Sequence, residues 1–339
     1  GMRGLKVVTI LSALLSVAGS TFIMLTWRLQ RGTRRSLGMH IIFCLSLADF
    51  ASSLVFIIDG IAPTGVLEAE KCGGEGANSL PGLCMLLAAL SQFTGLAAIL
   101  WTACIAVGLH LGVLRRSKLM TQEPARLRRY MHAAVWGAAG VSLLIMSAVP
   151  NTLGPTGQWC WIRRDAMVWA GGTFYYLPLV AVFAYSMGIY GLTRRTLLHL
   201  HREASNATSL GGSGGGGGHA DNSARGTATS ASRGGALTGL TSRLRGFLLV
   251  FGVIHACQLT NRLWDLVFPA HPSYFLYLLQ SALGPLQGLG NAIAYGWSPL
   301  TRRVWAHACP ALCGWAEPVE VDLHMSAGSR AREIAPPLE

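Results

Sequence analysis

The chain has 339 residues, of which 51% are hydrophobic and only 12% charged, and its mean hydropathy is +0.43. Soluble domains carry about 25% charged residues, so this chain has too little charge to cover a water-facing surface, and an ordinary soluble enzyme is excluded. The formal net charge of +12 is compatible with nucleic acid or anionic lipid as a partner, and the positions of the basic residues decide between them.

Seven segments are apolar and long enough to cross a bilayer as helices, which takes about 20 residues each. In chain order they cover about 5–27, 39–60, 82–112, 130–150, 167–193, 244–266 and 273–297. Charged residues are rare inside them, and a helix satisfies its own backbone hydrogen bonds in lipid. Pro178 and Pro285 lie inside two of the segments, where proline is tolerated and favours a kink. The sequence therefore predicts an all-α membrane protein, a bundle of seven transmembrane helices in the lipid bilayer.

The basic residues predict the orientation of this bundle. All but six of the 27 lysines and arginines lie in the first, third and fifth connections and in the tail. Positively charged connections stay in the cytoplasm, so the N-terminus is expected outside the cell and the C-terminus inside. The net charge is then mostly a topology signal, and no predicted fold supports nucleic-acid binding.

Two segments are predicted to lie on the cytoplasmic side. Residues 196–242 are rich in glycine, serine and threonine and predict a disordered third cytoplasmic loop within a receptor domain at 1–298. Its serines and threonines are candidate sites for kinase and arrestin-type regulation, and a plain spacer is the alternative. The tail, 299–339, opens with an expected amphipathic helix at about 299–308. Cys309 and Cys313 follow it, either palmitoylated or as unmodified thiols.

Three of the eight cysteines are expected on the outer side, where disulfides persist: Cys72, Cys84 and Cys160. A bond between Cys84, which opens the third span, and Cys160 would hold the second outer loop over the mouth of the bundle. A pairing of Cys72 with Cys160 is the alternative. Cysteines inside spans, such as Cys44, are expected to act as small apolar side chains.

Several motifs carry a resemblance to a known family. They are "SLADF" (46–50), "LWTACIAVGLHL" (100–111), "CW" (160–161), "FYYLPL" (174–179), "NR" (261–262) and "LQGLGNAIAYGW" (286–297). Together with seven spans and the cysteine at the top of the third, they resemble G-protein-coupled receptors of the cyclic-AMP-receptor-like family, which is distantly similar to secretin-type receptors. The resemblance runs from about residue 5 to 305. Where rhodopsin-like receptors carry Glu/Asp-Arg-Tyr, this chain has His110 and Leu111.

The resemblance implies a receptor at the plasma membrane that binds an extracellular agonist and activates a heterotrimeric G protein, without cofactor or enzymatic activity. It does not imply that cyclic AMP is the agonist. A polytopic transporter or channel is the alternative, although the sequence shows no internal repeat. A retinal-binding pump is excluded because the seventh span has no lysine for a Schiff base.

Polar and aromatic residues near the outer ends of the spans are candidates for ligand contact: Trp161, Arg262, Asp59, Gln280 and Tyr175. Arg262 is three residues before Asp265, so the two can pair on one helix face, and Arg262 could also take an anionic ligand group. Snorkelling to the membrane interface is the ordinary alternative for such an arginine. Trp169 is a further candidate for a cavity wall or an interfacial anchor.

Asp49 lies in the middle of the second span, where a buried charge is costly and usually functional. We expect it to hydrogen-bond polar groups such as Asn291 and, with Asn291 and Tyr295, to act in switching. Static polar packing is the alternative. Gly288 belongs to the same span-seven motif, where small residues allow helices to approach closely.

Basic residues at the inner ends of the third and fifth spans are candidate contacts for the G protein: Arg115, Arg116, Arg194 and Arg195. Anionic lipid headgroups account for them equally well. No metal site is expected, because His110, His132 and His255 are each interpreted as hydrogen-bonded structural residues.

Overall fold

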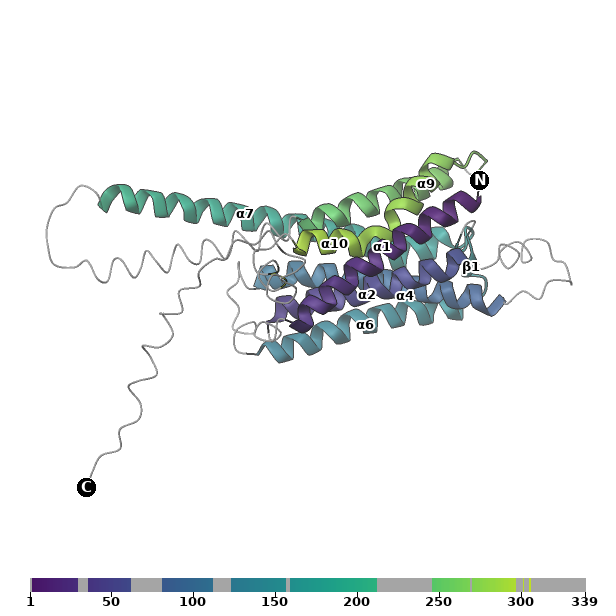
Figure 1. Cartoon of the computed structure of the whole chain (residues 1–339), viewed down its shortest axis with the longest axis horizontal. Helices are drawn as coiled ribbons and strands as arrows, with labels where there is room; N and C mark the ends of the chain where they lie inside the picture. The colour runs from purple at the N-terminus through teal and green to yellow at the C-terminus, as the bar shows by residue number, and fades with distance from the viewer. Residues whose placement is uncertain are drawn as a thin grey trace, which may run out of the picture.

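The computed structural model describes residues 2–29, 36–61, 81–111, 123–156, 159–211, 246–268 and 270–296, together with residues 301 and 305. Long helices lie side by side in one bundle, and the N-terminus is at the same end as strand β1 (Figure 1). The helical segments are α1 (Met2–Leu29), α2 (Leu37–Ile61), α4 (Pro81–Leu109), α6 (Pro124–Ala148), the π-helix η2 (Met167–Tyr176) that runs into α7 (Leu177–Gly211), the helix Gly246–Val267, α9 (Tyr274–Leu283), the 3-10 turn η3 (Gly284–Leu286) and α10 (Gln287–Gly296).

Six of these helices are long and apolar enough to span a membrane. Large apolar side chains on the outside of the bundle are exposed, with Leu144 at 71% and Phe275 at 67%. Water does not favour so much exposed apolar surface, whereas lipid does. The predicted all-α, multi-pass membrane bundle is therefore confirmed, while its orientation across the membrane stays a prediction.

The seventh predicted span differs from the other six because it is interrupted. α9 and α10 are separated by η3, which contains Pro285. Proline lacks a backbone N–H and crowds the preceding turn, so the chain tightens locally instead of continuing one α-helix. Pro178 lies at the second position of α7, directly after η2. Both prolines of the apolar spans thus mark a change of helix type.

Helix α7 is longer than the predicted fifth span. It continues to Gly211 and extends beyond its neighbours (Figure 1), so the start of the predicted loop at 196–242 is helical. The rest of that loop lies outside the described residues. Thr301 and Trp305, the two described residues of the helix predicted at 299–308, are helical. The Trp305 indole N–H donates to Thr26 Oγ1 at 2.8 Å, and its ring stacks on Phe22.

Helices α1 and α10 approach each other closely at two glycines. A Cβ placed on Gly288 would lie 2.2 Å from Ser20 Oγ and 2.9 Å from the Ser16 carbonyl oxygen, while one on Gly19 would lie 2.6 Å from Leu289 Cα. The Gly288 backbone N–H donates to Ser16 Oγ at 2.9 Å. The small residues of the span-seven motif therefore permit backbone contact with α1, as expected of membrane helices.

Replacing Gly288 with alanine is expected to lower the free energy of unfolding by about 1–3 kcal/mol, because the added methyl group overlaps α1. The matched control is Gly140→Ala in α6, where an added Cβ meets nothing within 4 Å. The measurement is the unfolding midpoint of each purified variant in detergent. Equal midpoints for Gly288→Ala and Gly140→Ala would show that α1 and α10 can move apart to accommodate the methyl group without loss of stability.

Candidate ligand-binding site

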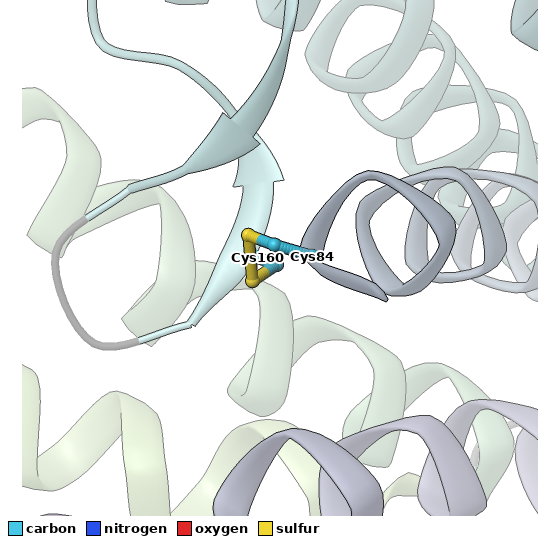
Figure 2. The surroundings of a disulfide bond; sticks show 2 residues. All are labelled: Cys84 and Cys160. Carbon is cyan, nitrogen blue, oxygen red and sulfur yellow. A yellow bond between two sulfur atoms is a disulfide. The ribbon is translucent and has the colours of Figure 1, made fainter. Parts of the chain in front are cut away.

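A disulfide joins the start of α4 to a short hairpin (Figure 2). Cys84 lies in the first turn of α4 and Cys160 in β2 (Cys160–Ile162), which pairs antiparallel with β1 (Leu153–Pro155). The sulfur atoms are 2.08 Å apart and the Cα atoms 5.3 Å apart. The predicted pairing is thus present, which excludes the alternative bond from Cys160 to Cys72, a residue outside the described ranges. We call this end of the molecule the disulfide end.

The hairpin directs Trp161 into the bundle. The Trp161 indole N–H donates to Gln92 Oε1 at 3.1 Å, and the Gln92 amide donates to the Phe174 carbonyl oxygen at 3.2 Å. Gln92 is fully buried and also lies 3.5 Å from Ser142 Oγ. One amide therefore links the hairpin, α4, η2 and α6. Gln92 was not among the residues predicted from the sequence, although an amide inside an otherwise uncharged span was a usable signal.

Replacing Trp161 with phenylalanine is expected to lower the free energy of unfolding by about 1–3 kcal/mol, because the buried Gln92 Oε1 loses its donor. The control is Trp169→Phe, since Trp169 is 39% exposed and is not a cavity wall. Thermal unfolding in detergent measures the difference. A Trp161→Phe protein as stable as the Trp169→Phe protein would show that the Gln92 bond contributes nothing.

A cavity of about 80 Å³ lies beneath the hairpin. Four of the five predicted ligand residues line it: Trp161, Asp59, Gln280 and Tyr175. Tyr176, Gln258 and His255 add further polar groups, and Asp49 lies at the cavity's other extreme, in the middle of α2. A space of this size holds a few water molecules, whereas sites for drug-sized ligands measure roughly 300–1,000 Å³. The cavity, which is lined by many polar residues, must therefore widen to take a larger ligand.

Arg262, the fifth predicted ligand residue, is not part of the cavity lining. Its guanidinium carbon lies 5.3 Å from the centre of the Trp159 ring and 5.7 Å from that of Trp161. Arg262 Nη1 is 3.5 Å from Asp265 Oδ2, which also accepts from the Tyr277 hydroxyl at 2.6 Å. The predicted Arg262–Asp265 pair is confirmed. Because a buried arginine needs partners, Arg262 stacks behind the two tryptophans and supports them instead of facing the cavity.

Several polar residues that line the cavity are hydrogen-bonded within their own helix or to a neighbouring element. The Tyr175 hydroxyl donates to Gln258 Oε1 at 3.4 Å, and His255 Nδ1 donates to the same oxygen at 3.0 Å. The Asn261 amide donates to Gln280 Oε1. Asp59 is buried, and its Oδ1 has no hydrogen-bond partner among the described residues. The cavity lining thus contains amide groups that are hydrogen-bonded and one carboxylate oxygen, Asp59 Oδ1, that accepts no hydrogen bond from the described residues.

Asp49 and Asn291 meet in the middle of the bundle. The Asn291 amide donates to Asp49 Oδ2 at 2.7 Å, and both side chains are 3% exposed. The predicted hydrogen bond between them is confirmed. Tyr295, one turn further along α10, is fully buried, and its hydroxyl contacts Met39 Sδ at 3.2 Å near the start of α2. The three predicted switch residues therefore tie α10 to α2 at two levels.

The predicted G-protein contacts are only partly described. Arg194 and Arg195 are exposed on α7, in the part that leads away from the disulfide end. Arg115 and Arg116 lie outside the described residues. The role of all four stays a prediction.

The arrangement of helices is that of a known membrane fold. The chain resembles the crystal structure of squid rhodopsin with a TM-score of 0.65, covering 92% of this chain and 86% of that one. The sequences are 13% identical, so the likeness concerns the fold alone. The chain is therefore a seven-helix membrane protein of the rhodopsin architecture.

The sequence comparison specifies the family within that architecture. A profile of the slime mold cyclic AMP receptor family matches residues 2–208, more than half of the chain, and the chain belongs to this family of G-protein-coupled receptors. Over 123 residues it is 32% identical to cyclic AMP receptor 1 of Dictyostelium discoideum, which is 36% of this chain and 30% of that protein. Over 290 residues it is 26% identical to G-protein coupled receptor 1 of Arabidopsis thaliana, covering 85% of this chain and 76% of that one.

A third relative, cyclic AMP receptor-like protein A of Dictyostelium discoideum, is 22% identical over 299 residues, or 87% of this chain and 64% of the relative. The resemblance inferred from the motifs is thereby confirmed, and the class is that of a receptor and not of an enzyme.

Proposed function

We propose that this protein is a plasma-membrane receptor that binds an extracellular agonist beneath the hairpin and activates a heterotrimeric G protein at the opposite end of the bundle. The observation that carries the proposal is the polar cavity. It connects Trp161, held by the disulfide-linked hairpin, to Asp49, which bonds Asn291 of α10. An agonist that binds one conformation of the bundle more tightly than another increases the population of that conformation.

The proposed orientation follows from chemistry at the two ends. A disulfide persists in an oxidising environment, so the disulfide end faces outward. Arg194 and Arg195 are then exposed on the cytoplasmic side, where positive charge is retained and where a G protein would bind.

The lining favours a neutral or cationic polar agonist. Among the described residues that line the cavity, Asp49 and Asp59 are carboxylates and none is lysine or arginine. Arg262, the expected partner for an anion, does not line the cavity; its Nη1 is paired with Asp265, while its Nε and Nη2 have no hydrogen-bond partner among the described residues. A ligand phosphate would therefore meet two acidic side chains. One of the relatives is named cyclic AMP receptor 1 and another cyclic AMP receptor-like protein A, so cyclic AMP is a necessary comparison in the test, although it is not the expected agonist.

The test is guanine-nucleotide exchange on a panel of purified heterotrimeric G proteins, with the full-length receptor in nanodiscs. We expect exchange above that of empty nanodiscs with at least one heterotrimer. Adenosine and cyclic AMP, which share base and ribose but differ in charge, test the preference of the cavity. No exchange with any heterotrimer, together with solute or ion flux in receptor-containing liposomes, would favour the transporter or channel alternative.

A further inference from the structure

A cluster of three possible metal ligands lies away from the cavity, towards the end of the bundle opposite the disulfide. His40 and Cys44 are one turn apart on α2, and His132 faces them from α6. His40 Nε2 lies 2.7 Å from His132 Nε2, while Cys44 Sγ lies 3.6 Å from His40 Nε2 and 3.9 Å from His132 Nε2. None of the three residues lines the cavity.

We propose that His40, Cys44 and His132 bind a zinc ion that links α2 to α6. Zinc prefers tetrahedral sites of imidazole nitrogen and thiolate sulfur, with bonds of about 2.0–2.1 Å to nitrogen and 2.3 Å to sulfur. In such a tetrahedron the sulfur and a nitrogen are about 3.6 Å apart and two nitrogens about 3.3 Å. Both observed sulfur–nitrogen distances are close to this value. The two nitrogens must separate by about 0.6 Å, which small rotations of the rings provide.

Hard cations are disfavoured at this cluster because it offers no oxygen ligand, and a thiolate with two imidazoles suits zinc or another borderline or soft ion. Three protein ligands leave the fourth position to water. Cys44 is 3% exposed while both histidines are half-buried, so the histidine side of the cluster is open to an incoming ion. Because the ligands come from two helices, a bound ion would stabilise the packed bundle over the unfolded chain.

Trp136 holds His132 in the tautomer that opposes metal binding. Its indole N–H donates to His132 Nδ1 at 3.0 Å, so Nδ1 is unprotonated, and the proton of neutral His132 lies on Nε2, directed at His40. The ligand atom must lose that proton before it binds zinc. The proton cannot move to Nδ1 without facing the indole N–H. Trp136 therefore lowers the affinity of the site for zinc, although it also orients the ring of His132.

Arg128 is the charged group whose field reaches all three ligands. Its positive charge repels a bound cation, and the burial of Cys44 disfavours the thiolate that zinc requires. Together with Trp136, these two effects make the site weaker than a structural zinc site, and suited to a reversibly bound ion. His132 was expected from the sequence to be a hydrogen-bonded structural histidine, and its contacts with Trp136 and His40 are the metal-free state of the same cluster.

The test uses the purified full-length protein in detergent, with zinc titrated against a chelating dye. One zinc per chain is expected, and Cys44→Ser and His132→Gln should each weaken binding at least 10-fold, the smallest loss seen even for outer-shell changes. The controls are Cys257→Ser and His110→Gln, which change the same residue types outside the cluster. Binding that is equal in Cys44→Ser and wild type would overturn the proposal.

Two further measurements do not depend on the folding of ligand variants. Cobalt(II) added to the wild-type protein should give thiolate-to-cobalt charge-transfer absorption, and its absence would exclude Cys44 as a ligand. Trp136→Phe keeps an aromatic ring beside Trp101 but removes the indole N–H. We expect it to bind zinc about 10-fold more tightly, because it frees the tautomer of His132. Unchanged or weaker binding would refute the role assigned to Trp136. Zinc binding by His40, Cys44 and His132 does not depend on the proposed G-protein coupling.

Discussion

Replacing Cys84 with serine is expected to lower the free energy of unfolding by about 4 kcal/mol, the value that the chain-entropy model gives for a loop of this length. The two cysteines are 76 residues apart, and the loop they close contains most of α4, the whole of α6 and β1. Without the bond, β2 keeps its non-covalent contacts, among them its partner strand, the Trp161–Gln92 hydrogen bond and the packing of Trp161 against Arg262 and Tyr175. The unfolding midpoint of the purified protein and its abundance at the cell surface measure the loss.

The double variant Cys84→Ser/Cys160→Ser separates the bond from the side chains. Because either substitution alone already removes the disulfide, the double variant should be no less stable than the single ones. Cys257→Ser, which changes a free cysteine in the helix Gly246–Val267, is the matched control and should leave the midpoint unchanged. If Cys84→Ser unfolds at the wild-type midpoint, the hairpin is positioned without its covalent tie.

The spans could be predicted because each depends on local composition. Twenty apolar residues specify a membrane helix whatever their neighbours, and all seven predicted segments correspond to helices in the structure. The ends were less predictable. α7 continues to Gly211 because helix-forming residues follow the apolar stretch, and the seventh span divides at η3, where the position of Pro285 suggested a kink but not a 3-10 turn.

Contacts between side chains could be predicted only in two cases: where helix spacing brings two residues together, and where a lone polar group in the membrane would be too costly without a partner. The Arg262–Asp265 pair follows from three-residue spacing on a helix, and the Asp49 bond from the cost of an isolated charge in a membrane. Gln92 was missed because its partners come from three other elements. The metal-ligand cluster was missed for the same reason, since His132 is 92 residues from His40 in sequence.

The largest effect on signalling is expected from Asp49→Asn. The substitution keeps the shape of the side chain but replaces the carboxyl group that accepts the hydrogen bond from Asn291 with an amide. Within the proposed function, the difference alters the balance between receptor states, so nucleotide exchange on the G protein should change by about 10-fold, which corresponds to 1.4 kcal/mol. The exchange rate per folded receptor is the measurement, with folding checked by the unfolding midpoint.

The exchanged pair Asp49→Asn/Asn291→Asp decides between a switch and static packing. It restores one carboxylate and one amide in contact, so a role that depends on the bond itself should return exchange towards wild type. Ser46→Ala is the control, because Ser46 is also buried on α2, and its bond among the described residues is to the Ile42 carbonyl oxygen of its own helix. If Asp49→Asn lowers stability and leaves exchange per folded receptor unchanged, the Asp49–Asn291 contact only holds α2 and α10 together. Recovery in the exchanged pair alone would instead place the bond in the equilibrium that the agonist shifts.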